Sequence, residues 1–222
     1  MSGRRNYRLS LVTAPASEPV TTAEAKTHMR VDTSTDDTYI GTLVTIARTA
    51  AEKYTRRAFI NQTWKMFLDP PQVVMRDEWW SGVRQSSIRS LSNPESIDLP
   101  LAPLVSVTHV KFYDDSDAAV TFDSGNYQVS AYAGETADKG RITLRTGAVW
   151  PSVGSAGLRN ADAMEIQFVA GYGSSGSSVP SQIKQGILAE IAHLYENRGD
   201  CSGGVSSDLA RSLLNQFRLI EV

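Results

Sequence analysis

The spacing of apolar residues changes twice along this chain, and this change constrains its fold most strongly. Between 36 and 57, apolar side chains recur every three or four residues, which places them in one stripe along a helix. From 60 to 172 they occur in short β-forming runs separated by turn residues. The helical spacing returns after 180. This order predicts an α+β fold, with N- and C-terminal helices packed as a small bundle and a central, mostly antiparallel β-module.

The pattern also predicts where the elements lie. Thr21 and Glu24 have capping-box spacing and mark the start of the first helix. Helices are predicted at 22–30, 36–57, 181–198 and 207–217, and strands at 60–69, 96–101, 104–114, 120–122, 126–132, 141–146 and 164–172. The predicted parts are an N-terminal helical part (1–58), a β-module with a polar insert at 70–95 (59–172), and C-terminal helices with a tail (173–222). The third part is expected to pack with the N-terminal helices.

Composition excludes several kinds of protein. The 222 residues carry a net charge of −2, which gives no global attraction to nucleic acid or to an anionic membrane. A single cysteine, Cys201, excludes an intrachain disulfide and a cysteine-based zinc site. The N-terminus resembles a signal peptide, but its apolar stretch at 9–12 is too short. We therefore expect a soluble, unprocessed chain with no membrane association.

The stretch "GYGSSG" (171–176) matches the glycine pattern that binds a dinucleotide pyrophosphate. In such a site the third glycine lies in the first turn of a helix, and a second strand follows that helix. Here Pro180 delays the helix, Glu196 falls at its end instead of after a next strand, and no second strand follows. The pattern favours a flexible or tightly turning connector over a nucleotide site.

Other short motifs are also weak. Glu190 and His193 form half of a di-iron carboxylate motif, but the matching second half is absent. Arg198-Gly199-Asp200 spells an adhesion tripeptide, yet a glycine after a helix that ends in arginine is an ordinary C-terminal cap. Cys201 has no evident partner base. The sequence therefore indicates no enzyme, no cofactor and no metal site.

Two adjacent tryptophans, Trp79 and Trp80, stand in the polar insert. Neighbouring residues on an extended chain point to opposite sides, so the two are hard to bury together. Either they fold back on the β-module, or they insert into another subunit or partner, as tryptophan often does at binding hot spots.

The order of segments resembles the head-to-tail connector (adaptor) proteins of long-tailed bacteriophages and gene transfer agents. The resemblance runs from about Pro19 to Arg218, although the insert at 70–95 is longer than usual. Its most specific stretches, in this order, are "INQTW" (60–64), "LPLAPL" (99–104), "AGYG" (170–173) and "AHLYENR" (192–198).

The resemblance implies a non-enzymatic structural protein without a cofactor, located in the virion neck and assembled in the bacterial host cytoplasm. Its copies would form a twelve-subunit ring beneath the portal protein, extend the DNA channel and offer a platform for the next neck, stopper or tail protein. DNA would pass through the lumen without sequence-specific binding, which suits a nearly neutral chain.

Two sets of interface residues follow from this interpretation. The family's C-terminal segment reaches towards the portal, so residues 206–222 are expected to dock there. The expected portal or partner residues are Leu213, Leu214, Phe217 and Arg218, together with Trp79 and Trp80. The polar backs of the helices at 36–57 and 181–198 suit lateral contacts in a ring. The expected subunit-interface residues are Arg48, Glu52, His193 and Glu196.

Three alternatives remain open at this level. The chain could be another neck or tail component, such as a stopper or tail terminator. It could also be a nucleotide-binding enzyme built on "GYGSSG", or an extracellular adhesion module built on Arg198-Gly199-Asp200.

Overall fold

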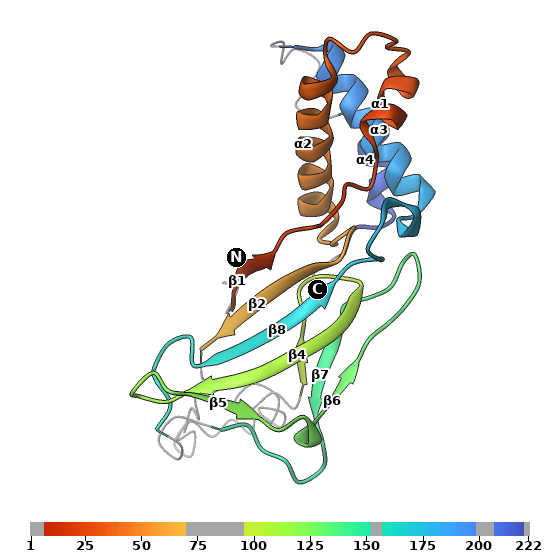
Figure 1. Cartoon of the computed structure of the whole chain (residues 1–222). Helices are drawn as coiled ribbons and strands as arrows, with labels where there is room; N and C mark the ends of the chain where they lie inside the picture. The colour runs from red at the N-terminus through yellow and green to blue at the C-terminus, as the bar shows by residue number, and fades with distance from the viewer. Residues whose placement is uncertain (1–6, 70–95, 152–156, 199–206, 220–222) are drawn as a thin grey trace, which may run out of the picture.

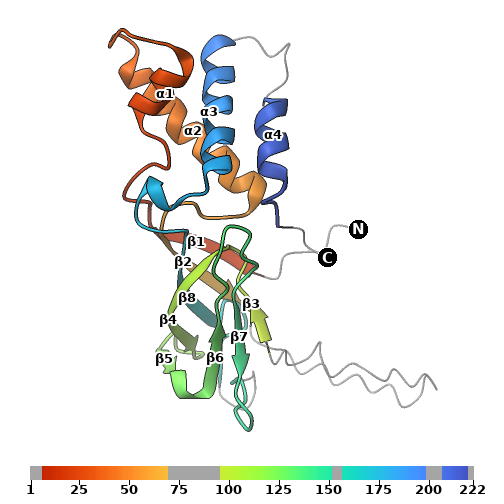
Figure 2. The same cartoon turned by 90° about the vertical axis from the view of Figure 1, so that its right-hand side faces the viewer.

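Helices gather at one end of an elongated molecule and strands at the other (Figure 1). The computed structural model describes residues 7–69, 96–151, 157–198 and 207–219. Figure 2 shows the same two layers from a direction at right angles, with the helices again at one end of the sheets. The predicted α+β class with mostly antiparallel sheets is confirmed. The predicted division of the chain into three parts, with boundaries at 58 and 172, stays a proposal.

Four α-helices lie in the described residues: α1 (Thr22–Met29), α2 (Asp37–Thr55), α3 (Ser181–Glu196) and α4 (Asp208–Asn215). α1 begins with the predicted capping box between Thr21 and Glu24. α1 and α2 end at Arg30 and Arg56, whose φ angles of 57° and 59° are left-handed. The helix predicted at 36–57 was therefore too long at its C-terminal end. No helix in the described parts of the chain combines the length and apolar character needed to span a lipid bilayer.

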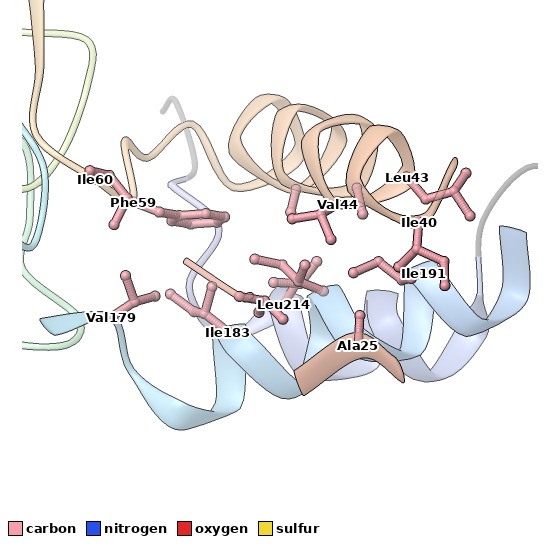
Figure 3. Packing of buried hydrophobic residues seen from close by; sticks show 14 of the residues in the cluster. Ala25, Ile40, Leu43, Val44, Phe59, Ile60, Val179, Ile183, Ile191 and Leu214 are labelled. Atoms are coloured by element: carbon pink, nitrogen blue, oxygen red, sulfur yellow. The ribbon is translucent and has the colours of Figure 1, made fainter. Parts of the chain in front are cut away.

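The four helices share one apolar core. Figure 3 shows the side chains of this cluster facing one another between α2, α3, α1 and α4. Most of the apolar stripe predicted for α2 is buried, including Ile40, Val44 and Ala47, none of which is more than 2% exposed. Ala50, which the same spacing placed in the stripe, is exposed. Ile183, Ile187 and Ile191 of α3 pack against the buried part of the stripe, so the helices depend mainly on this shared face for their stability.

The strands form two antiparallel sheets. The larger has the order β1 (Tyr7–Thr13), β2 (Gln62–Leu68), β8 (Met164–Ala170), β4 (Leu104–Tyr113) and β5 (Ala119–Phe122). The smaller has the order β3 (Ser96–Asp98), β7 (Arg141–Leu144) and β6 (Tyr127–Ser130). Short 3₁₀ helices occur at Ser124–Asn126 and Gly176–Ser178.

The larger sheet has two different faces. Its inner face carries Met66, Ile166 and Phe168, which are fully buried in one cluster with Tyr127 and Ile142 of the smaller sheet. The outer face carries the alternate residues of the same strands, and these are mostly polar. This alternation is the ordinary pattern of an antiparallel sheet that is covered on one side only.

Strand β1 was not predicted from the sequence. It lies at the edge of the larger sheet and pairs with β2, with Leu9 opposite Met66. Most of its side chains are exposed, so it contributes little apolar burial, although Leu9 and Leu11 alternate with Arg8 and Ser10 as expected for a strand. The N-terminal residues before α1 therefore contribute a strand to the larger sheet.

The capping box of α1 predicts a pH-dependent contribution to stability. The hydrogen bond from Lys184, followed by that from the Thr21 backbone, lowers the pKa of Glu24 from 4.5 to about 2. Because the folded-state pKa is depressed, the stabilisation is present above pH 4.5 and is lost as the pH falls towards 2. The side chain is 43% exposed, so the effect is small.

We expect Glu24→Gln to lower the free energy of unfolding by about 0.5–1 kcal/mol at pH 7, and by less at pH 3. Urea denaturation at both pH values measures the difference. Glu135→Gln, at an exposed carboxylate, is the matched control. An equal loss at both pH values would contradict the assignment of this carboxylate.

Candidate functional site

Three chain segments cross between the helical layer and the sheets, at 14–21, 56–61 and 171–180. We call two stretches of them, 56–61 and 171–176, the joint. They lie side by side, because the Asn61 amide donates to the Gly173 carbonyl at 2.9 Å and the Tyr172 amide to the Phe59 carbonyl at 3.2 Å. The Gly171 amide donates to the Pro103 carbonyl at 2.9 Å. These bonds fix the segment that contains "GYGSSG" at the boundary between the layers.

The glycines of the joint are required by close backbone approach. Gly171 has a φ of +152°, and a Cβ there would lie 2.5 Å from the Asn61 amide nitrogen. A Cβ on Gly176 would lie 2.6 Å from the Pro19 carbonyl oxygen. Helix α3 begins only at Ser181, so the third glycine is outside its first turn. The geometry agrees with the interpretation of a tight connector, not of a dinucleotide site.

A buried polar network ties α2 to the joint. The Glu52 carboxylate accepts hydrogen bonds from the Phe59 amide at 3.0 Å, from Gln62 at 2.6 Å and from Arg48 at 2.7 Å. Arg48 also donates to Glu18 at 2.7 Å. Burial raises the pKa of Glu52, although these hydrogen bonds oppose the shift. The network therefore joins the N-terminal segment, α2 and β2 in one subunit.

The position of Arg48 and Glu52 differs from the sequence interpretation. Both were placed on the polar back of α2, yet their side chains are only 11% and 14% exposed. They are covered because Glu18 and Gln62, which are distant in sequence, come together over this side of the helix. Their role within one subunit is thus visible, while their role between subunits stays a prediction.

The other expected interface residues on α3 lie near its C-terminal end. His193 is half-buried, and its Nδ1 lies 3.2 Å from the side-chain Nδ2 of Asn197, whereas Glu196 is exposed. Glu190, one turn earlier, is buried and accepts a hydrogen bond from the Ser207 amide at 3.0 Å. No group of three or more metal-ligating side chains occurs among the described residues. Glu190 therefore ties α3 to the start of α4.

The expected portal-contacting residues divide into two pairs. Leu214 and Phe217 are 5% and 2% exposed and belong to the core of the helical layer. Leu213 is half-buried and Arg218 is exposed, with its guanidinium 5.3 Å from the centre of the Tyr54 ring. In this conformation only the second pair presents side-chain surface to a partner. Trp79 and Trp80, like Cys201, lie outside the described residues.

A polar cluster on the outer face of the larger sheet was not anticipated. Glu165 is only 1% exposed and receives hydrogen bonds from His109 and Tyr113, both at 2.8 Å. Lys65 forms an ion pair with it at 3.1 Å. Burial alone would raise the pKa of Glu165, but the bonds from these three side chains outweigh it and hold the pKa below its ordinary value. The available sequence signal was Glu165 itself, a charged residue inside the otherwise mostly apolar run 164–170.

The described residues form a helical layer on two β-sheets, and no cluster of metal-ligating side chains occurs among them. Residues 20–111 match the family model described as phage gp6-like head-tail connector protein. No curated protein sequence matches the chain.

Solved structures share the fold over nearly the whole chain. A chain in "Neck of empty GTA particle computed with C6 symmetry" is 22% identical, with a TM-score of 0.71 and 97% of both chains covered. A chain in "Virion of native gene transfer agent (GTA) particle" is 22% identical, with a TM-score of 0.69 and 96% of both chains covered. A chain in "Neck of native GTA particle computed with C12 symmetry" is 22% identical, with a TM-score of 0.65 and 97% of both chains covered. The resemblance to the connector family predicted from the sequence is confirmed, by the family model over 20–111 and by the shared fold beyond it.

The fixed joint leads to a prediction about its glycines. Gly171→Ala should lower the free energy of unfolding by about 2 kcal/mol or more, because the added Cβ meets backbone atoms and the φ angle is unfavourable. Gly41→Ala in α2 is the control, since its Cβ would come no closer than 3.9 Å to Thr22 and alanine favours helix. Urea denaturation compares the two, and equal stability would contradict the close approach.

The buried network gives a second prediction. Arg48→Met removes the cation between Glu18 and Glu52 and leaves the buried Glu52 carboxylate without its ionic partner. We expect a loss of about 3 kcal/mol in the free energy of unfolding at pH 7. Arg211→Met, at an exposed position of α4, should change stability by less than about 0.5 kcal/mol. A similarly small effect at Arg48 would show that the network does not stabilise the joint.

Proposed function

We propose that this chain is a structural, non-enzymatic protein of a virion neck, the head-to-tail adaptor. Its copies form a ring beneath the portal, extend the DNA channel and carry the next neck or tail protein. The single observation that carries this proposal is the fold shared with a neck-particle chain over 97% of both chains. The family match over 20–111 supports the same role.

Symmetry supports a ring of twelve. The similar chains come from neck reconstructions described with C6 and with C12 symmetry. A ring of twelve obeys both, because C6 is contained in C12, whereas a ring of six obeys only the first. If the matched chains occupy one position in the neck, twelve copies satisfy both descriptions. Such a ring needs a heterologous interface, in which two different surfaces of each copy meet.

The charges of the chain suit a DNA conduit. A net charge of −2 over 222 residues gives little overall attraction to phosphate. DNA would therefore slide through the ring without sequence-specific contacts. Nothing in this role requires a cofactor or a membrane.

The C-terminal segment is proposed to dock on the portal. Leu213 and Arg218 have surface available for such a contact. Leu214 and Phe217 occupy the helical core, so their participation would require α4 to leave its place on α3. The lateral contacts proposed for His193 and Glu196 would use the far end of α3, and those proposed for Arg48 and Glu52 would need the cover over α2 to open.

Electron microscopy of particles, together with the mass of the purified protein, tests the function. We expect a twelve-fold ring of this chain in direct contact with the portal, and its absence from particles made without the gene. A ring separated from the portal by another protein would instead identify a stopper or tail terminator. Particles without any ring of this chain would contradict the proposal, whereas a monomer in solution would not, since the portal can template the ring.

A further inference from the structure

Among the described residues, no strand pairs with the outer side of β1 or of β5, so these two strands form the edges of the larger sheet. Both edges expose apolar side chains: Leu11 and Val12 of β1 are 45% and 49% exposed, and Val120 of β5 is 62% exposed. An edge strand also presents unpaired backbone N–H and C=O groups, which makes it a template for another strand. Two such edges on one sheet are the two different surfaces that a heterologous ring interface needs.

Both edge strands place apolar side chains on the same face of the larger sheet. Leu9 and Leu11 lie opposite Met66 and Trp64 of β2, on the inner face of the sheet. Val120 lies opposite Phe112 of β4, on the same inner face. If β5 of one copy lay beside β1 of the next, the inner apolar layer would continue across the junction. On the outer face, Ser10 and Thr121 would continue the polar surface.

The directions of the strands also match. Each step from β1 through β2, β8 and β4 to β5 is antiparallel, so β1 and β5 run in the same direction. Copies related by a small rotation keep nearly the same orientation and would therefore bring β5 parallel to the next β1. Parallel pairing is a regular sheet geometry. The register shift between Leu11 and Thr13 limits the available part of β1 to Tyr7–Leu11.

Charge favours the pairing of unlike edges. The sequence around β5, at 114–123, carries four aspartates and no cation, whereas β1 (Tyr7–Thr13) carries one arginine, Arg8, and no carboxylate. Asp117 is paired with Arg159, and Arg8 with Asp162 and Asp69, within one subunit. Lys53 and Arg56 line a groove beside Tyr7 and add cations on the β1 side. Two β5 edges would bring aspartates together and repel each other, whereas the pairing of β5 with β1 avoids this repulsion.

We propose that β5 of one copy pairs with the Tyr7–Leu11 part of β1 of the next copy, so that the larger sheets join edge to edge around the ring. The partner is a second copy of this chain. This inference rests on the proposed ring, and it names the surfaces that close it.

Cross-linking tests the pairing directly. Ser10→Cys and Thr121→Cys are placed together in the full chain, with Cys201→Ser to remove the native thiol. A short bismaleimide is then added to assembled particles. We expect a ladder of covalent multimers that extends to the closed ring. The control pair, Ser10→Cys with Gln128→Cys on β6, should remain monomeric on denaturing gels.

A charge introduced at the edge provides a second readout. Val120→Lys should lower the yield of rings at least tenfold, because a lysine on the inner face would be buried at the junction. The melting temperature of the isolated chain should not change, since Val120 is exposed. Val149→Lys is the matched control, because Val149 is 68% exposed but lies outside both edges.

The outcomes separate the two proposals. Particles that contain the ring but give no Ser10–Thr121 cross-link, or rings that form normally with Val120→Lys, overturn the edge pairing and leave the adaptor function in place. Particles without a ring of this chain overturn both. Cross-linked multimers together with loss of rings in Val120→Lys, but not in Val149→Lys, support the pairing.

Discussion

The carboxylate of Glu52 is the interaction on which the two-layer arrangement depends. It receives hydrogen bonds from the Phe59 amide, from Gln62 and from Arg48, so one buried group contacts α2, the joint and β2. Burial raises its pKa, which means that ionisation is unfavourable without these donors. Arg48 extends the network to Glu18, just before α1. Removal of any donor would leave a charge with too few partners, so the layers keep one orientation.

The glycines beside this network also help to hold the two layers in one orientation. Gly171 and Gly176 allow two backbone segments to approach so closely that no side chain fits between them. Close approach lets the amides of Asn61 and Tyr172 reach carbonyl groups on the neighbouring segment. A motif that suggests mobility or phosphate binding thus serves to bring two connections together. Glycine supplies a permitted φ and the absence of a Cβ, and both are used here.

The sequence predicts what depends on local patterns. The stripe of α2 and the capping box at Thr21 and Glu24 involve residues a few positions apart, and both are present in the structure. β1 was missed although Leu9 and Leu11 alternate with Arg8 and Ser10, because so short a stretch near the N-terminus was considered only as the apolar part of a signal peptide. The cover over Arg48 was missed because Glu18 lies thirty positions away, and helical spacing cannot show which distant segment crosses a polar face. Glu165 is similar, since His109 and Tyr113 reach it only through the register of β4 and β8.

A fixed joint matters most if the two layers contact different partners. The surfaces available for docking at the C-terminus, Leu213 and Arg218, belong to the helical layer, whereas the open edges β1 and β5 belong to the larger sheet. In a ring, sheet contacts would set the rotation between copies, and helical contacts would set how the ring sits on its neighbour. A small change in the angle between layers would then be repeated in every copy around the closed circle. Because closure tolerates little accumulated error, a buried ionic network and close-packed glycines at the boundary suit such an assembly better than a flexible linker would.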